Sequence, residues 1–218
     1  MEREFSTALN GVATVHSGRI KLVNVIPGEL SALENSVYSE AEKLATAEVD
    51  IIVYGCTSGS FIRGHKQYAA IEEEVEKSFG IPCVATAGAV VRALNHLNSK
   101  KIALVTPYTF EITEVERRFL VAHGFETLST YYASIKENTV IGRVSDEEVF
   151  KWVVKQPDKN ADAVFVSCTN LSTFRVLGKI EQTLDIPAVS SNSATLWSVV
   201  TRLGVRLLGR PLGRLFEQ

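Results

Sequence analysis

Two cysteines, Cys56 and Cys168, are each followed directly by threonine and stand in segments that resemble one another. The first segment reads DIIVYGCTSGSFIR and the second reads DAVFVSCTNLSTFR, so in both an aspartate precedes the Cys-Thr pair and a Phe and an Arg follow it. Two thiols that face one cleft can exchange protons with a carbon acid or add to an activated double bond. The repeat therefore predicts a two-thiol active site, with Cys56 and Cys168 as its catalytic residues.

Hydroxyl and amide side chains follow each cysteine: Thr57 and Ser58 after the first, Thr169 and Asn170 after the second. If a buried strand ends at each cysteine, free backbone N–H groups and a helix dipole at that point would hold a carboxylate and favour thiolate over thiol. These donors would also stabilise the negative charge of an enediolate-like intermediate. We therefore expect a small carboxylate substrate, although the same four side chains could instead serve as helix caps.

The remaining chemistry-bearing residues predict little. Cys83 follows Ile-Pro at the start of a predicted strand, and we interpret it as a small buried hydrophobe. Three cysteines without a C-x-x-C pair indicate neither a disulfide framework nor a zinc site. Because the four histidines lack metal-like spacing and no nucleotide-binding glycine motif occurs, we expect no metal and no cofactor.

Short runs rich in Val, Ile and Ala alternate with amphipathic stretches along the chain. The predicted strands are residues 19–25, 50–54, 82–86, 101–106, 128–135, 163–167 and 188–190. The predicted helices are residues 32–47, 66–79, 87–97, 111–123, 146–155, 174–184 and 194–203. Apolar strands without clean alternation are typical of a parallel sheet buried on both faces, and alternating strands and helices predict βαβ units.

The repeat extends beyond the cysteines, because each Cys-Thr segment is followed by a helix and then by Ile-Pro and a short strand. We therefore predict an α/β fold of two similar lobes related by a pseudo-twofold axis, each a mostly parallel sheet flanked by helices. Lobe one comprises residues 1–97, with residues 194–218 as a segment that could complete it, and lobe two comprises residues 98–193. Lobe two opens with a strand before its first helix, whereas lobe one opens with the helix-like MEREFSTALNGV. We expect the leading strand of lobe one to be missing because the chain starts late.

The overall composition excludes several classes of protein. The chain has 218 residues, of which 45% are hydrophobic and 22% charged, with a net charge of -2. This balance is ordinary for a globular protein and argues against a nucleic-acid partner. No apolar run approaches the roughly 18 residues that cross a bilayer, and the N-terminus lacks the regions of a signal peptide. We expect a cytoplasmic protein with reduced thiols and no membrane partner.

Around these residues the sequence resembles the aspartate/glutamate racemase superfamily, and within it the branch of maleate cis-trans isomerase and arylmalonate decarboxylase. The resemblance covers nearly the whole chain, down to the tail GRPLGRLFEQ. It implies two α/β lobes that enclose the site at their interface, with no metal or organic cofactor. From the motifs VTPYT and KENTVIGRVS it adds Tyr108 and Asn138 as residues that bind a substrate carboxylate. Isomerases and racemases of the superfamily carry both cysteines, whereas the decarboxylases carry glycine in place of Cys56.

The resemblance implies a cofactor-independent isomerase that converts maleate to fumarate. Cys56 would add to the alkene as a thiolate, giving a succinyl-like adduct, and Cys168 would give or hold the proton; the symmetry of the sequence alone leaves the nucleophile open. The alternatives are an amino-acid or hydantoin racemase that uses two-base proton transfer, an arylmalonate-type decarboxylase, and a non-catalytic binding protein. The resemblance also implies a homo-oligomer, a dimer or higher, and a leading strand and asparagine-bearing loop that this sequence lacks. We therefore expect one wall of the site to be open.

Overall fold

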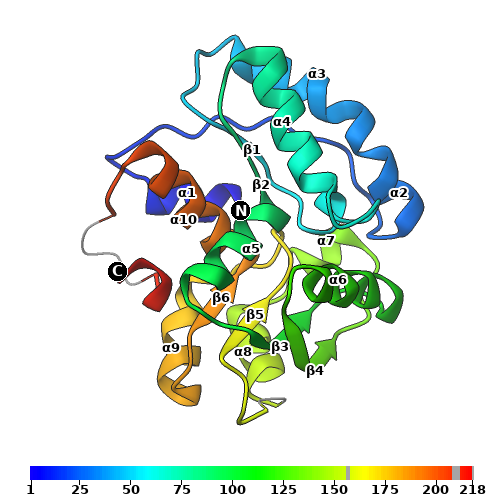
Figure 1. The fold of residues 1–218 in the computed structure, drawn as a ribbon, viewed down its shortest axis with the longest axis vertical. Coiled ribbons are helices and arrows are strands. Elements are labelled where there is room, and N and C mark those ends of the chain that lie inside the picture. The colour runs from blue at the N-terminus through cyan, green and yellow to red at the C-terminus, as the bar shows by residue number, and fades with distance from the viewer. Residues whose placement is uncertain (156–157, 208–211, 218) are drawn as a thin grey trace.

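The computed structural model describes residues 1–155, 158–207 and 212–217, so the tail GRPLGRLFEQ lies partly outside the described residues. Parallel strands flanked by helices make up the fold (Figure 1), and the predicted α/β class is confirmed. Over the described ranges, none of the helices combines the length and the apolar character that a bilayer span requires.

The strands and helices follow the alternation expected from the sequence. The strands are β1 (Ile52–Tyr54), β2 (Cys83–Ala85), β3 (Lys101–Thr106), β4 (Glu126–Tyr132), β5 (Ala163–Val166) and β6 (Ala188–Ser190). The α-helices are α1 (Glu2–Ala8), α2 (Pro27–Ala32), α3 (Glu34–Ala45), α4 (Gln67–Phe79), α5 (Thr86–His96), α6 (Phe110–Ala122), α7 (Asn138–Ile141), α8 (Asp146–Val154), α9 (Phe174–Leu184) and α10 (Ser191–Leu203). Two short 3-10 helices are η1 (Ser58–Ser60) and η2 (Arg214–Phe216).

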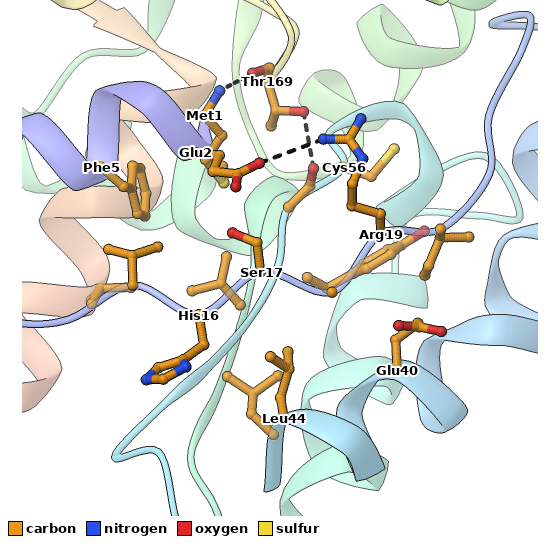
Figure 2. A pocket seen from close by; sticks show the side chains of 18 of the residues that line it. Met1, Glu2, Phe5, His16, Ser17, Arg19, Glu40, Leu44, Cys56 and Thr169 are labelled. Carbon is orange, nitrogen blue, oxygen red and sulfur yellow. Dashed lines mark hydrogen bonds and ion pairs between the residues drawn. The ribbon is translucent and has the colours of Figure 1, made fainter. Parts of the chain in front are cut away.

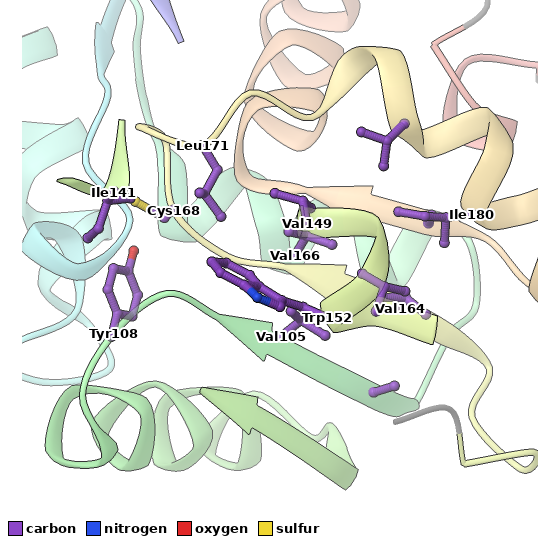
Figure 3. Close-up of a cluster of buried hydrophobic side chains, with 14 of the residues drawn as sticks. Val105, Tyr108, Ile141, Val149, Trp152, Val164, Val166, Cys168, Leu171 and Ile180 are labelled. Carbon is purple, nitrogen blue, oxygen red and sulfur yellow. The ribbon is translucent and has the colours of Figure 1, made fainter. Parts of the chain in front are cut away.

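Within the described ranges the strands form two parallel sheets, one with the order β1-β2 and one with the order β4-β3-β5-β6. Strand β5 shows why its sequence does not alternate between polar and apolar residues. Val164 and Val166 pack into the cluster of Figure 3, which contains Trp152, whereas Ala163 and Phe165 pack into a second cluster on the opposite face. A strand that is covered on both faces requires apolar residues throughout.

Helices α5 and α10 follow the equivalent strands β2 and β6 and pack against each other (Figure 1). Each of them also contacts both of these strands. Small residues such as Ala87, Ala89 and Ala93 line the buried side of α5 and let the neighbouring elements approach closely. The packing joins the sheet that precedes Cys56 to the sheet that precedes Cys168. The lobe boundaries at residues 97–98 and 193–194 stay a prediction.

The strand predicted at residues 19–25 is wrong. Ile20 and Leu22 do pack against the core, which explains the alternating pattern. No neighbouring strand among the described residues lies alongside this segment, however, and its pairing is limited to an isolated antiparallel bridge between Asn24 and Glu137. The pattern therefore predicted the burial of alternate side chains but could not supply a hydrogen-bonding partner for the backbone.

Glu4 of α1 connects the start of the chain to the second sheet. Its carboxylate accepts hydrogen bonds from the backbone N–H groups of Thr173 and Phe174, at 2.6 and 2.7 Å, and from the side-chain amide of Asn192. Thr173 and Phe174 form the amino-terminal end of α9, whose free N–H groups need acceptors. We expect Glu4→Ala to lower the free energy of unfolding by about 3 kcal/mol, because it leaves buried donors without a partner.

Urea denaturation checks this expectation, with Glu2→Ala as the matched control. Glu2 lies on the same helix, and its ion pair with Arg19 is exposed. The control should therefore change stability by less than about 1 kcal/mol. Equal effects of the two substitutions would show that the contacts of Glu4 contribute nothing specific.

Candidate active site

A pocket of about 660 Å³ runs along β1 and α3 and reaches the turns that carry Cys56 and Cys168, and Figure 2 shows part of its wall. All the site residues predicted from the sequence line it, namely Cys56, Thr57, Ser58, Tyr108, Asn138, Cys168, Thr169 and Asn170. Helix α1 and the extended segment that carries His16, Ser17 and Arg19 contribute the remaining wall seen in Figure 2. The structure thus brings the predicted residues together, while their individual roles stay predictions.

Both cysteines occupy the same place relative to a strand. Cys56 comes two residues after β1 ends, and Cys168 comes two residues after β5 ends. Ligands of parallel α/β sheets bind at this carboxyl edge of the strands. The sulfurs are near enough for a charge on Cys168 to raise the pKa of Cys56. The two thiols therefore act as one electrostatic unit.

The expectation that the strand ends favour thiolate is wrong. Burial raises the pKa of the Cys56 thiol to about 11, and burial also raises the pKa of Cys168. The three-residue helix η1 comes after Cys56, and a turn comes after Cys168, so neither sulfur stands at the amino terminus of a long α-helix. The free-energy cost of removing a thiolate from water exceeds the stabilisation that the N–H groups of these short elements provide.

Local donors nevertheless aim at both sulfurs. The Gly59 N–H donates to Cys56 Sγ at 3.3 Å, and the Asn170 N–H donates to Cys168 Sγ at 3.4 Å. The Ser58 side chain also lowers the pKa of Cys56 through a hydrogen bond. These donors stabilise a sulfur anion once it forms.

Hydroxyl groups connect the two Cys-Thr turns. Thr57 Oγ1 donates to Ser191 Oγ at 2.8 Å, and that same Ser191 oxygen accepts the backbone N–H of Cys168 at 3.0 Å. In the opposite direction, Thr169 Oγ1 donates to the carbonyl of Gly55 at 2.9 Å (Figure 2). Both threonine hydroxyl hydrogens are therefore engaged with protein acceptors. Their backbone N–H groups have no acceptor in the part of the chain that the structure describes, so they remain available for an anion.

Ser191 was not among the site residues predicted from the sequence. A signal was present, because the internal repeat aligns Ser191 in IPAVSSNS with Thr86 in IPCVATAG. Both residues come directly after a short strand and begin a helix, α10 or α5. A hydroxyl residue at the same place in both halves indicates a shared position at the interface.

The two predicted asparagines contact each other at the edge of the pocket. Asn170 Nδ2 donates to the carbonyl of Asn138 at 2.7 Å and to its side-chain oxygen at 2.9 Å. The amide of Asn138 in turn donates to the Leu22 carbonyl at 3.3 Å. Asn138 begins α7, a single turn that is not among the helices predicted from the sequence. The longest of these three hydrogen bonds is the one from the Asn138 amide to Leu22, so this amide is the group that a ligand carboxylate could recruit as a donor.

Tyr108 lies beneath Cys168 and is almost fully buried (Figure 3). A hydrogen bond from its hydroxyl lowers the pKa of Cys168. Burial raises the pKa of Tyr108 itself well above its usual value, so the phenol remains a neutral donor. Next to it lie Ser167 and a buried carboxyl, Glu116, neither of which was among the predicted site residues. The signal for Glu116 was a charged residue on the apolar face of the predicted helix.

The backbone at Cys168 is strained. Its φ is +100°, a region that residues other than glycine rarely occupy, whereas Cys56 has no positive φ. Such strain persists where the surrounding structure enforces it, and it is concentrated at functional sites. The two cysteines are thus equivalent in the fold but differ in local geometry.

Comparisons with known proteins agree with this geometry. Maleate isomerase of Geobacillus stearothermophilus is 26% identical over 199 residues, covering 88% of this chain and 79% of that protein. Arylmalonate decarboxylase of Bordetella bronchiseptica is 28% identical over 200 residues, covering 90% and 83%. A cysteine-to-serine mutant of Nocardia farcinica maleate cis-trans isomerase, solved with a covalently bound succinylcysteine intermediate, superposes with a TM-score of 0.93 at 22% identity, covering 99% and 91%.

The sequence profile of the arylmalonate decarboxylase family matches residues 12–216, which is nearly the whole chain. The match confirms the branch that the sequence motifs around the cysteines indicated. The chain belongs to the arylmalonate decarboxylase family.

Proposed function

We propose that this protein is a cysteine-dependent isomerase that converts maleate to fumarate. The observation that carries the proposal is the pair of thiols, Cys56 and Cys168, at equivalent strand ends in one pocket. Two further facts support it: maleate isomerases are among the relatives, and a structural neighbour of that name holds a succinylcysteine intermediate. A succinyl adduct is what addition of a thiol to maleate produces.

The pocket offers donors for a dicarboxylate on both sides of the thiol pair. The N–H groups of Thr57 and Thr169 lie one residue beyond each cysteine, and neither has a protein acceptor among the described residues. The Tyr108 hydroxyl and the amide of Asn138 add side-chain donors. We assign these four groups to the substrate carboxylates, where they would also hold the negative charge that develops during addition.

The chemical steps balance without a cofactor. Cys56 Sγ, as thiolate, forms a bond to one alkene carbon while the π bond breaks and the neighbouring carbon takes the proton from Cys168. The product is S-succinyl-Cys56 beside a Cys168 thiolate. Rotation about the former double bond between the two alkene carbons, which is now a single bond, comes next. Cys168 then removes a proton as the C–S bond breaks and fumarate leaves. One negative charge passes between the two sulfurs throughout the cycle.

The raised pKa values fit this cycle. Because charge on one sulfur opposes charge on the other, the pair loses one proton far more easily than two. The reactive form thus has one thiol and one thiolate, as the proposed steps require. At neutral pH it is a minor form, since burial raises the pKa of Cys56 to about 11. We therefore expect the reaction rate to rise with pH on the acid side.

We assign the nucleophile to Cys56 and the proton to Cys168. Cys168 is 6% exposed and lies against the neutral phenol of Tyr108, which would stabilise the thiolate that remains after Cys168 has given its proton to the substrate. Cys56 is the more exposed residue of the two. The arrangement leaves Cys56 as the sulfur that an incoming alkene meets first.

Arylmalonate decarboxylation is the second candidate function. The family match and the relative from Bordetella bronchiseptica favour it. A decarboxylase needs one proton donor for the carbanion left after carbon dioxide departs, so it would leave one of the two thiols unused. The pair Cys56 and Cys168 therefore favours the isomerase.

Proton NMR with the purified protein tests the proposal. Maleate, a prochiral arylmalonate and a set of chiral amino acids and hydantoins in deuterated water would be supplied separately. Appearance of fumarate supports the isomerase. Loss of carbon dioxide from the arylmalonate identifies a decarboxylase, and α-proton exchange without isomerised alkene identifies a racemase; either result with unchanged maleate would overturn the proposal. Homo-oligomeric state and cytoplasmic location stay predictions.

A further inference from the structure

Glu116 is a carboxylic acid buried in the core behind the pocket. It lies on α6, is 1% exposed, and forms no ion pair within the part of the chain that the structure describes. Ser167 Oγ donates a hydrogen bond to its Oε1 atom at 2.6 Å. The other oxygen, Oε2, has no hydrogen-bond partner in the described residues. A buried carboxyl that keeps one oxygen unpartnered is costly and calls for an explanation.

A chain of hydrogen-bonding groups leads from Glu116 to the proposed reaction centre. Ser167 Oγ lies 2.6 Å from the carboxyl and 3.5 Å from the Tyr108 hydroxyl. Tyr108 in turn forms a hydrogen bond with Cys168, and Figure 3 shows its hydroxyl end near that cysteine. The order is Glu116, Ser167, Tyr108 and Cys168. Three of the four residues are less than 2% exposed, so water does not compete for these hydrogen bonds.

The number of hydrogen atoms decides the direction in which the groups of this hydrogen-bond chain can donate. If Glu116 is ionised, Ser167 must donate to it, and the Ser167 oxygen is then an acceptor that competes with a pocket anion for the only hydrogen of Tyr108. If Glu116 is protonated, it can donate to Ser167, Ser167 can donate to Tyr108, and the phenol hydrogen is free for an anion. A hydroxyl has a single hydrogen to donate, so these two arrangements exclude each other.

We propose that Glu116 is a positioning residue whose proton turns the hydrogen bonds of Ser167 and Tyr108 toward the pocket, so that the phenol donates to an anion there. The anion is the Cys168 thiolate or a substrate carboxylate, so the catalytic consequence rests on the proposed function. The direction of the hydrogen-bond chain itself does not. Glu116 touches no reacting atom and acts only through its neighbours.

The pKa of Glu116 places this change in an accessible range. Burial raises its pKa from the ordinary value to about 8, and the hydrogen bond from Ser167 opposes that rise. The titratable groups that face it are Tyr108 and, beyond it, Cys168 with its neighbours Cys56 and the Met1 ammonium, which are the same in every variant compared below; on its own helix, Glu114 and Arg117 pair with each other at the partly exposed surface. From β4, the sheet strand that packs against α6, no charged group shifts the pKa of Glu116. The donating arrangement therefore prevails below about pH 8 and is lost as the pH rises through that value.

Loss of the donating arrangement above about pH 8 predicts a specific dependence of kcat/KM on pH. Below pH 8 the rate rises with pH because the thiol pair loses its first proton. Above pH 8 the same gain is offset by the loss of the Tyr108 donor, so kcat/KM levels off. In Glu116→Gln the amide can donate to Ser167 at every pH, and an anion at the far end of the chain selects that orientation. We expect the rise to continue through pH 8, so that between pH 7.5 and 9.5 the variant gains on the order of tenfold relative to the unsubstituted protein.

Two measurements test the proposal, one of them independent of any reaction. Infrared spectra between pH 5 and 10 follow the carbonyl band of a protonated buried carboxyl. The band should vanish with a midpoint near pH 8 in the unsubstituted protein and in the control Glu111→Gln, an exposed position on the same helix. It should be missing in Glu116→Gln, and in Ser167→Ala its midpoint should rise because the opposing hydrogen bond is gone. The second measurement is kcat/KM for maleate against pH for the same four proteins.

The outcomes separate the two hypotheses. If the infrared band titrates as expected but maleate is not isomerised, the proposed function fails while the assignment of Glu116 as a proton holder stands. If Glu116→Gln and Ser167→Ala lower activity equally at every pH and the profile still levels off near pH 8, Glu116 is merely structural and the inference is overturned. A profile that rises through pH 8 in both variants, but not in Glu111→Gln, supports it.

Discussion

Replacing either Cys56 or Cys168 by alanine is expected to lower kcat/KM for maleate at least about a thousandfold, because each sulfur performs a covalent or proton-transfer step that no neighbour can take over. The double variant should be scarcely worse than either single one, since the two thiols act as one unit. Proton NMR of the conversion to fumarate measures the effect.

Cys83→Ala is the matched control. Cys83 is fully buried in β2, within the strand rather than beyond its end, and no hydrogen bond connects its sulfur with those of Cys56 or Cys168 among the described residues. It should retain activity within about threefold, because removal of a single sulfur from a core site affects mainly stability. Full activity of Cys56→Ala would contradict the assigned nucleophile.

The serine variant of the second cysteine separates the two roles. In Cys168→Ser, Cys56 can still attack and the serine hydroxyl can still supply the proton for the addition, but serine is too weak a base to remove a proton from the adduct. We expect the protein mass to increase by one maleic acid and the label to map to Cys56 by peptide sequencing. If no adduct forms in Cys168→Ser but one forms on Cys168 in Cys56→Ser, the two sulfurs have been assigned in the wrong order.

Most of the architecture was predictable because apolar strands and amphipathic helices differ in periodicity. The strands β3 and β6 and the helix α9 have the predicted bounds, and the other strands beyond residue 50 differ by a few residues. The segment 19–25 failed for a reason that periodicity cannot register. A strand needs a neighbour, and the sequence of one segment does not say whether another lies beside it.

The candidate site was predictable to the level of which residues meet, since the internal repeat gives both cysteines the same place beyond a strand. The role of each side chain was harder to predict from the sequence. The hydroxyl of Thr57 is engaged by Ser191, a contact that spans 134 positions of sequence. The direction of the thiol pKa shifts was predicted wrongly because local dipoles can be read from sequence, whereas the extent of desolvation depends on the complete fold.

Gly59→Ala is the second substitution from which we expect a large effect. An ideal Cβ at Gly59 would lie 2.9 Å from Cys56 Sγ, 2.5 Å from the Tyr54 hydroxyl and 3.1 Å from Leu33 Cδ1. All three distances are below ordinary van der Waals contact, and the Gly59 N–H is itself a donor to Cys56 Sγ. The sulfur must therefore move. A displacement of the order of 1 Å at a reacting atom costs about a hundredfold in kcat/KM, so we expect a loss of that size.

Stability should change far less than activity. Overpacking by a single methyl group costs about 1–3 kcal/mol, and the Cys56 side chain has the pocket on one side into which it can turn. Gly28→Ala is the control, because a Cβ at this position in α2 meets nothing within 4 Å. It should leave both activity and the thermal midpoint nearly unchanged. A loss of activity in the control equal to that of Gly59→Ala would mean that the assay reports folding rather than the position of the sulfur.

A second substitution at Tyr54 shows whether crowding at the sulfur is the cause. The Tyr54 hydroxyl is buried without a hydrogen-bond partner among the described residues, so Tyr54→Phe removes the atom nearest to the new methyl group without breaking a bond. In the double variant the methyl group can shift toward the vacated space and away from Cys56. We expect the double variant to recover at least about tenfold of the activity that Gly59→Ala loses, because the sulfur returns toward its original position. If Tyr54→Phe alone is as inactive as Gly59→Ala, the hydroxyl serves the chemistry directly, and the steric explanation for glycine at this position is wrong.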